Sequence, residues 1–578
     1  MSLMGSLYIG SSGLRTSQNA LNTTAHNMAN VNTPGYTRQM VMQGTRQYNT
    51  ISISGSAIAR QQLGLGVVYA ETKTQRDIFL DKAFRRESGR SAFYEVSTNT
   101  LEEVENLLQE LDGEAFAAAL DNLWKSVQDL ANEPDQASRQ SVFIQRCYEF
   151  LTRADAVYQG LSDYQDNINR SIREDVERIN EIGRGINDLN LRIRRIEAGN
   201  IENANDLRDM RDSLIDELSA LANISCQTDA FGNITVKIEG NDFVTTDTYN
   251  QISLYTDPVT GFYTPYWEML ATKDANGGLV LDKNGRMEES AQAFRLDQAI
   301  SSASNTDIGL VKSKLLARGT HRATFEDIAV SNGLIYPGYE PTRHDLKIDN
   351  PFSQEYDPDT YNPSYYDQNI AQSVVMNMQA QFDQLIYQVA SGINDILREA
   401  ANAAGTWPES TYMRDAYGNP LQVFDLTANE AADDAPPGPY TVKNIIINSE
   451  LRQAPTLLGF RQADGQTDYE TATKLKALFD GRDYTLNPNV QTKVNLTGYY
   501  NAMVSQVANS SSVSREIYKN QQLTVEQVGA AREQVLGVST DEELGFMVMY
   551  QNAFNASSRY INVISEMLEH VVTQLGSR

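Results

Sequence analysis

The residues of this sequence that could do chemistry are its carboxylates, four histidines and two cysteines. Two Asp-x-Asn-Gly segments, 274–277 and 282–285, resemble the start of a calcium-binding EF-hand loop. Such a loop needs glycine at its sixth position, where this chain has Leu279 and Met287. We therefore interpret both segments as turns and predict no metal site.

Catalytic arrangements are equally hard to find. The sequence shows no nucleophile elbow and no pair of acids that stands out as a catalytic dyad. No histidine has a second ligand at a metal-binding spacing; the four are His26, His321, His344 and His570. We predict no catalytic residue, no cofactor and no enzymatic activity. Because a missing motif does not exclude a glycosidase, a secreted acidic hydrolase stays open as the alternative function.

The cysteines and a short glycine motif also favour structural interpretations. Cys147 and Cys226 each lie in an apolar-periodic or strand-like run, which predicts buried thiols and no disulfide or metal cluster. The segment Gly64-x-Gly66 lacks the third glycine of a nucleotide-binding loop and opens no helix. We interpret it as a bend between strands.

Length and charge narrow the class of protein. The chain has 578 residues, enough for about three or four domains. Its formal net charge of -27 argues against a nucleic-acid partner, which needs a basic face. No run of 18 apolar residues predicts a membrane span, and the first thirty residues lack the pattern of a cleaved signal. Cytosolic residence and export without a cleaved signal both remain open.

The N-terminal stretch, residues 3–36, predicts a helix that depends on a partner. In steps of four and three from Leu3, each position carries either a large apolar residue or a small one, which is typical of a helical seam. Its glycines each cost roughly 1 kcal/mol of helix propensity, so the isolated helix is marginal. Pro34-Gly35 suits the centre of a type II turn and ends the helix. The seam residues are Leu3, Leu7, Leu14, Leu21, Met28 and Val31.

The C-terminal stretch, residues 540–578, supplies the candidate partner. Ser539-x-x-Glu542 is a capping box that begins a helix. This helix carries two apolar stripes, whereas a surface helix of a monomer needs one. We predict that one stripe packs on residues 3–31 and the other on a further copy of the chain. The first stripe contains Leu544, Met547, Phe554, Ile561, Leu568, Val572 and Leu575. The second contains Phe546, Tyr550, Ala553, Ser557, Tyr560, Ile564, Met567 and Val571.

A long helical block lies between residues 76 and 222, with breaks near Gly113 and Pro134. It contains four heptads with apolar a and d positions, interrupted only by Asp175: Ile168, Ile172, Ile179, Ile182, Ile186, Leu189, Ile193 and Ile196. A polar turn follows, and a second seam then predicts an antiparallel helical hairpin: Leu207, Met210, Leu214, Leu218 and Leu221.

The remaining segments predict strands, loops and further helices. Residues 37–69 and 228–263 are strand-like and divided by turn residues. The stretches 336–366 and 407–439 are irregular, and the second precedes a strand near 444–447. Helical stripes occupy the rest, one of them formed by Val374, Met378, Phe382, Ile386, Val389 and Ile393.

Several motifs together resemble the axial proteins of the bacterial flagellum, which form its rod, hook and hook-associated parts. The longest lies at the end of the first predicted helix and includes Asn27, Asn30, Asn32, Thr33, Pro34, Gly35 and Tyr36. The segments 76–81, 206–218 and 537–557 narrow the resemblance to the hook-associated proteins that join hook to filament. The resemblance covers roughly residues 1–240 and 366–578.

The resemblance implies a structural role outside the cell. A member of this family assembles with copies of itself in a helical ring between the flagellar hook protein and a second junction protein, hook-associated protein 3. It is transiently cytoplasmic, is bound by an export chaperone and leaves through the flagellar type III export apparatus. Its terminal helices fold on assembly. An adhesive role for the inserted segments also stays open.

The expected fold is multidomain α+β. Paired N- and C-terminal coiled-coil helices, residues 1–36 with 540–578, form an inner domain. An elongated α-helical bundle contains residues 37–225, 366–404 and 441–539. A β-rich outer domain spans 226–365, and an irregular insertion spans 405–440.

Overall fold

The computed structural model divides into two compact units. Unit 1 comprises Met1–Ser91, Arg178–Gln251 and Gln521–Arg578, and unit 2 comprises Ala92–Glu177 and Ile252–Asn520. The residues that the structure describes are 3–46, 49–53, 60–109, 116–199, 202–229, 232–275, 278–281, 287–332, 366–403, 420–427, 440–461 and 465–575.

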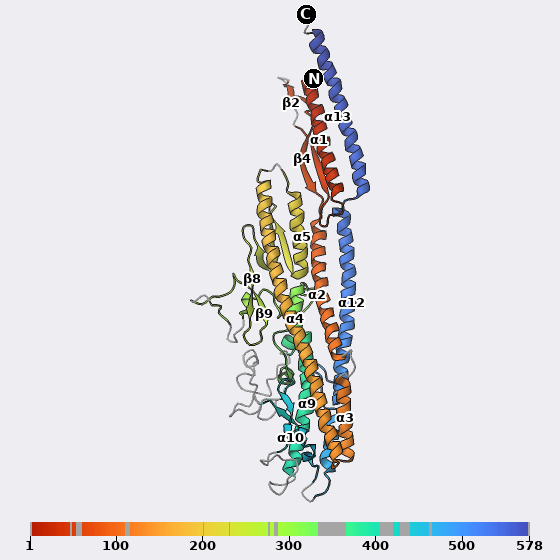
Figure 1. Ribbon diagram of the computed structural model, residues 1–578. Coiled ribbons are helices and arrows are strands. Elements are labelled where there is room, and N and C mark those ends of the chain that lie inside the picture. Colours follow the sequence, from red (N-terminus) through yellow and green to blue (C-terminus); the bar gives the residue numbers. More distant parts are fainter. Residues whose placement is uncertain are drawn as a thin grey trace. The chain divides into compact units, whose positions relative to one another are not determined.

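Three long helices have residues in both units. They are α2 (Ile78–Gln109), α4 (Ala137–Glu197) and α12 (Leu496–Leu536). Each unit is therefore built from segments that are far apart in the sequence (Figure 1). Among the described residues, no helix is both long enough and apolar enough to cross a membrane.

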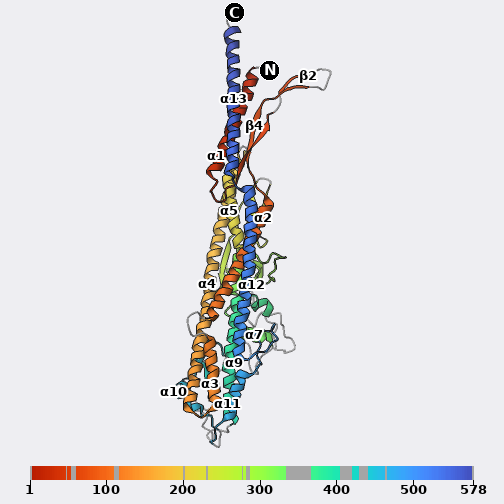
Figure 2. The same ribbon diagram turned by 90° about the vertical axis from the view of Figure 1, so that its right-hand side faces the viewer.

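The two ends of the chain meet in unit 1. Helices α1 (Leu3–Ala29) and α13 (Thr540–Leu575) lie side by side and antiparallel, with the two termini at the same end of the pair (Figures 1 and 2). The expected partnership of the first and last helices is therefore present within one chain.

Two antiparallel strand pairs follow α1. Strand β1 (Gln39–Thr45) pairs with β4 (Val67–Thr74), and β2 (Asn49–Ile53) pairs with β3 (Arg60–Leu63). The β1–β4 ladder packs on α1 and contains a bulge beyond Met42. Gly66, just before β4, has a φ of +91° and lies against the α1 backbone, which confirms the predicted bend.

The rest of unit 1 contains a helical hairpin and a small sheet. The last part of α4 runs antiparallel to α5 (Asn205–Leu221), as the ion pairs Arg208–Glu197 and Arg178–Glu217 show. Strands β5 (Ile224–Thr228), β6 (Ile234–Ile238) and β7 (Asn241–Val244) form an antiparallel sheet in that order. The predicted turns at Gly232 and Glu239-Gly240 have the positive φ angles that such turns need.

The heptad prediction is confirmed in α4 and wrong in α5. Seven of the eight α4 positions are buried, whereas Ile196, in the last turn, is 47% exposed. In α5 only Leu218 of the predicted seam is buried, and Met210 is 56% exposed. The buried face of α5 instead contains Asp209, Arg211, Asp212 and Ile215. Polar side chains lie inward here because ion pairs and hydrogen bonds satisfy most of their polar atoms.

Unit 2 is mainly helical and is organised around α9. Its helices include the parts of α2, α4 and α12 that lie in this unit. It also contains two short 3₁₀ turns, η1 (Glu289–Ala291) and η5 (Pro455–Leu458), and one π turn, η4 (Tyr366–Ile370). The other helices are α3 (Phe116–Asn132), α6 (Leu310–Arg318), α7 (Phe325–Asn332), α9 (Val374–Ala403), α10 (Ser449–Gln453) and α11 (Tyr469–Asp480). Two strand pairs complete it, β8 (Ile252–Thr256) with β9 (Tyr263–Trp267) and β10 (Phe424–Leu426) with β11 (Ile445–Ile447).

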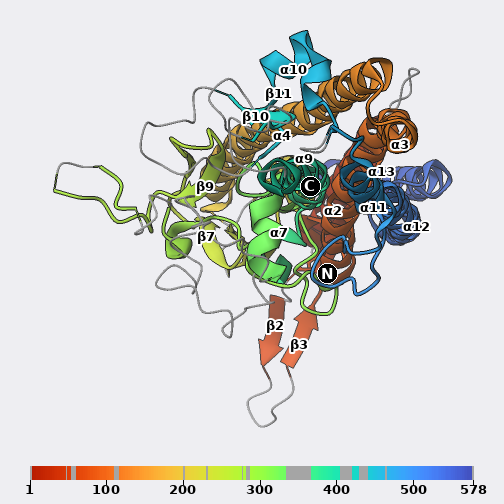
Figure 3. The same ribbon diagram turned by 90° about the horizontal axis from the view of Figure 1, so that it is seen from below.

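One large apolar core holds unit 2 together. The ring of Phe116 lies 4.8–5.3 Å from those of Phe150, Phe382 and Tyr500, so residues of α3, α4, α9 and α12 meet at one point. The predicted stripe on α9 is buried except for Val374, which is half-buried. Figure 3 shows α9 almost end-on with α7 beside it.

Two middle segments differ from the sequence-based expectation. The stretch 226–365, expected to be β-rich, also contains α6 and α7. The stretch 405–440, expected to be irregular, contains β10. The amide of Asn394 in α9 donates to the carbonyl of Phe424 and accepts from the N–H groups of Val423 and Phe424. A buried amide at a distance of thirty residues leaves no local pattern, so the strand could not be predicted. The predicted loop at 336–365 and the turns at 276–277 and 284–285 lie outside the described residues.

Candidate assembly site at the paired termini

The contact between α1 and α13 is made by small residues on the α1 side. The residues of α1 that are buried are Ser6, Gly10, Thr16, Ser17, Ala20, Thr24 and Asn27. A Cβ added to Gly10 would lie 2.7 Å from Cγ1 of Ile561, and one added to Gly13 would lie 2.8 Å from Oγ of Ser557. The two helices are therefore close enough that these positions have no room for a side chain.

The α13 side of this contact follows a heptad spacing. The side chains that are buried or half-buried at steps of four and three are Glu543, Met547, Tyr550, Phe554, Ser557, Ile561, Ile564 and Leu568. We call this set the inner seam. Members of both predicted stripes contribute to it, because the helix turns a mixed face toward α1. Its period of 3.5 residues is that of long helices that pack side by side.

The predicted assembly residues fall into three groups. Ile564 is buried at 6% exposure, whereas Leu544 and Val572 are exposed at 47% and 70%. Leu575 is the last residue of α13. The others are half-buried, on α1, just beyond it and on α13: Leu3, Leu7, Leu14, Leu21, Met28, Val31, Met547, Tyr550, Phe554, Ile561 and Leu568. The leucines of α1 therefore border the contact, and the small residues between them form its centre.

A second row of apolar residues on α13 is exposed, although Tyr560 also lies against Gly10 of α1. It consists of Met549, Ala553, Ala556, Tyr560, Val563 and Met567, again at steps of four and three. We call this row the outer seam. Its large members are exposed at 50% (Met549), 41% (Tyr560), 47% (Val563) and 50% (Met567). An apolar row of this regularity marks a surface that another helix can cover.

The motif at the end of α1 is a compact turn held by Asn27. Its buried amide donates from Nδ2 to the carbonyl of Gln39 (2.9 Å), and its Oδ1 accepts from the N–H of Gln39 (3.1 Å). The same oxygen accepts from the hydroxyl of Tyr36 (2.8 Å). Burial, followed by the charges of Asp206 and Asp209, raises the pKa of Tyr36, so this hydroxyl stays a donor. Asn27 thus ties the end of α1 to the first residue of β1.

The remaining motif residues shape the turn itself. Asn30 Nδ2 donates to the carbonyl of His26 (3.0 Å), and the Thr33 hydroxyl donates to Asn30 Oδ1 (3.2 Å). Gly35 has a φ of +77°, and the Tyr36 N–H donates to the carbonyl of Thr33 (3.2 Å). These features fit the predicted type II turn. Asn32 and Pro34 are exposed.

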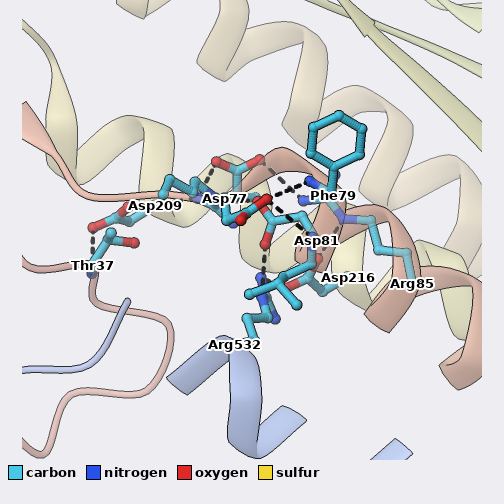
Figure 4. A network of polar contacts seen from close by, with 11 residues as sticks. Thr37, Asp77, Phe79, Asp81, Arg85, Asp209, Asp216 and Arg532 are labelled. Atoms are coloured by element: carbon cyan, nitrogen blue, oxygen red, sulfur yellow. Dashed lines mark hydrogen bonds and ion pairs between the residues drawn. The ribbon is translucent and has the colours of Figure 1, made fainter. Parts of the chain in front are cut away.

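A network of arginines and aspartates anchors the segment beyond this turn (Figure 4). Arg532 in α12 donates to Asp81 in α2 (2.7 Å) and to Asp216 in α5 (2.6 Å). Arg85 in α2 binds Asp216 (2.6 Å) and Asp212 (3.2 Å). Three helices that are far apart in the sequence are therefore joined by charge-assisted hydrogen bonds.

The same network reaches the backbone next to α1. Arg76 binds Asp81 (2.6 Å) and Asp212, and the N–H of Thr37 donates to Asp209 Oδ2 (2.9 Å). Burial works to raise the pKa of Asp81, but its bonds to the arginines outweigh it and the pKa is lowered. Burial raises the pKa of Asp209 to about 6, since Arg76 lies farther away, at 3.9 Å. The sequence contained both halves of this network as motifs, but nothing in it paired them.

One buried pair of a histidine and an aspartate was not predicted from the sequence. His321 Nε2 lies 3.1 Å from Asp327 Oδ1, and both residues are buried in unit 2. Within the part of the chain that the structure describes, no group of three or more histidine, cysteine or acidic side chains could hold a metal ion. Cys147 is buried and Cys226 half-buried, and both are free thiols.

Comparison with known proteins finds similarity to flagellar hook-associated proteins. Residues 101–287 match the flagellar hook-associated protein FlgK helical domain, and residues 7–37 match the flagella basal body rod protein family. Flagellar hook-associated protein 1 of Bacillus subtilis (strain 168) is 25% identical over 567 residues, which are 97% of this chain and 96% of that protein. The chain is therefore similar over nearly its whole length to a flagellar hook-associated protein 1, and part of it matches the FlgK family. This family is one of structural flagellar proteins, and nothing found favours the hydrolase alternative.

Other members of the FlgK family are similar over a smaller part. Flagellar hook-associated protein 1 of Salmonella typhimurium is 29% identical over 229 residues, 39% of this chain and 40% of that protein. The flagellar hook junction protein FlgK from Burkholderia pseudomallei is 13% identical in a structural alignment with a TM-score of 0.48, which covers 80% of this chain and all of that one.

Proposed function

We propose that this chain is a structural subunit of the junction between the flagellar hook and filament, and that it assembles through its terminal helices. Similarity to flagellar hook-associated proteins supports the structural role. The observation that supports assembly through the termini is the outer seam of α13, an exposed apolar row at heptad spacing. A subunit that works alone gains nothing from such a surface.

In this mechanism, the inner seam pairs α13 with α1 of the same chain and the outer seam packs against neighbouring copies. The outer seam extends over 19 residues from Met549 to Met567, or about 27 Å of helix. That length allows a continuous helix-to-helix contact. Apolar burial there stabilises the assembled state at about 25 cal/mol per Å². The terminal pair, which lies in unit 1, thus acts as the assembly surface.

The remaining partners in this proposal follow from the family. We propose contacts with the flagellar hook protein on one side and with hook-associated protein 3 on the other. Before assembly, the subunit is exported through the type III apparatus, and an export chaperone covers its exposed apolar helix. The final location is the extracellular flagellum.

The test replaces one residue of the outer seam by a charge and compares it with its neighbour. Val563→Asp puts a carboxylate in the seam, whereas Asn562→Asp puts the same carboxylate one position away, on an exposed polar site. We expect Val563→Asp to keep the monomer's helical circular dichroism and to abolish incorporation at hook tips, because an unpaired charge cannot be buried between helices. Asn562→Asp is expected to assemble and to support filament growth.

Filaments of normal number and length on cells that carry Val563→Asp would refute the proposed role of the seam. Loss of incorporation in both variants would also count against it, because the effect would then follow from added charge alone. Electron microscopy of hook tips and the swimming radius in soft agar measure the outcome.

A further inference from the structure

The joint between α12 and α13 lies in unit 1 and contains three residues outside either helix. Helix α12 ends at Leu536 and α13 begins at Thr540. Gly537 closes α12: its N–H donates to the carbonyl of Glu533 (2.7 Å), and a Cβ at this position would lie 2.6 Å from that same oxygen. The helix therefore ends at a glycine with no room for a side chain. A linker of three residues does not by itself fix the direction of α13 relative to α12.

One residue from the other end of the chain binds both sides of this joint. The backbone N–H of Arg38 donates to the carbonyl of Leu536, the last residue of α12 (2.9 Å). Its guanidinium donates from Nε to Glu543 (2.8 Å) and from NH1 to Glu542 (2.7 Å), both in the first turn of α13. The same guanidinium lies 5.5 Å from the ring centroid of Phe546, one turn further on.

The contact is protected from solvent and is itself held in place. The side chain of Arg38 is 12% exposed and that of Glu543 is 3% exposed, so at least this ion pair is shielded. The carbonyl of Arg38 accepts from the N–H of Gln75 (3.0 Å), just beyond β4. The preceding residue, Thr37, is bound to Asp209 in α5. Arg38 is therefore fixed to the body of unit 1 before it reaches α13.

The expected capping box is only half present, for the same reason. The Glu542 N–H lies 3.5 Å from the Ser539 hydroxyl, which is a long hydrogen bond. The Glu542 carboxylate accepts from Arg38, whereas the capping box would turn it back to Ser539. The acids of the first turn of α13 therefore serve a long-range contact as well as the helix dipole.

We infer that Arg38 is the positioning residue of the α12–α13 joint. Its backbone fixes the end of α12 and its guanidinium fork fixes the start of α13, so that one residue sets the direction in which the terminal helix pair leaves the rest of unit 1. The planar fork can bind two carboxylates at once, which a lysine ammonium cannot do with the same geometry. This inference concerns the free chain and holds whether or not the chain builds a junction.

The test measures the joint by pulsed electron paramagnetic resonance in the full-length chain. Spin labels on cysteines at Gln527 and Asn552, both exposed, report the distance between α12 and α13. The native cysteines, Cys147 and Cys226, are replaced by alanine. We expect a single narrow distance peak for Arg38. For Arg38→Gln we expect the fraction of molecules outside that peak to rise about tenfold, the ratio that corresponds to one lost charge-assisted hydrogen bond. Arg38→Lys is expected to lie between the two.

Two controls separate positioning from general damage. Arg15→Gln removes an exposed arginine from α1 and is expected to leave the peak unchanged. A second label pair, at Ser11 and Asn562, reports whether α1 and α13 remain paired. An unchanged peak in Arg38→Gln would overturn the inference. Equal broadening in Arg15→Gln, or loss of the Ser11–Asn562 distance in Arg38→Gln, would overturn it too, because the cause would then be lost charge or lost pairing.

Discussion

At the scale of single residues, the fit of α1 to α13 depends on side chains that are small or absent. Helix propensity and close packing act in opposite directions at the α1 glycines: each weakens the helix by roughly 1 kcal/mol but allows the partner helix to approach. Gly10 and Gly13 face Ile561 and Ser557 at distances that leave no space for a methyl group. From the sequence, the glycines are expected both to weaken the isolated helix and to allow close packing, and in the structure Gly10 and Gly13 are contact positions.

A pair of glycine substitutions tests this interpretation. Gly10→Val forces a branched side chain into the contact and should destabilise the terminal pair by about 1–3 kcal/mol, the usual effect of overpacking. Gly545→Ala in α13 adds a methyl group where nothing lies within 4 Å, so it should stabilise the helix by about 1 kcal/mol. Amide hydrogen exchange in α1 and α13 measures both changes. The two changes in stability must have opposite signs. Stabilisation by Gly10→Val would contradict the close contact.

At the scale of elements, charge networks decide which face of a helix is buried. In α4 the apolar heptads predicted the buried face correctly, since isoleucine side chains at a and d positions are stabilised by burial in the core. In α5 the leucine pattern did not predict the buried face, because Asp209 and Asp212 lie on that face and pair there with Arg76. Apolar periodicity predicts burial reliably only where no buried ion pair competes with it.

The arginine that joins three helices should therefore matter more than an exposed one. Arg532→Gln removes one of the two arginine partners of both Asp81 and Asp216, whose side chains are 7% and 19% exposed, and should destabilise unit 1 by about 1.5–3 kcal/mol. Arg178→Gln removes an ion pair of 47% and 43% exposed side chains and should change stability by about 0–1 kcal/mol. Hydrogen exchange of the α5 amides gives both values. A small effect of Arg532→Gln would show that the network is replaceable by water.

At the scale of the whole molecule, the chain combines a deeply buried core with a thinly covered pair of ends. In α9 of unit 2, the residues of the predicted stripe beyond Val374 are 3% exposed or less. In α13, by contrast, only Glu543 and Ile564 fall in the buried class among the described side chains. This contrast suits a subunit whose ends complete their packing on assembly.

The two regions should differ in local stability in the free monomer. We expect the amides of α1 and α13 to exchange with solvent much faster than those of α9, because few buried contacts oppose local opening of the terminal pair. Hydrogen exchange followed by mass spectrometry measures this, and addition of assembled hooks should slow exchange in the termini alone. Protection of the termini equal to that of α9 in the monomer would contradict coupled folding.

The sequence by itself determined the resemblance to flagellar hook-associated proteins, the two terminal helices, the turn at Pro34-Gly35 and the buried faces of α4 and α9. These features follow from local spacing, which needs no knowledge of what lies opposite. Only the tertiary structure decided which side of α13 faces α1, how the motif arginines and aspartates pair, and that Arg38 binds both sides of the α12–α13 joint. Those contacts join residues that can lie more than five hundred positions apart, and their strength depends on distance, burial and geometry, which no pattern along the chain records.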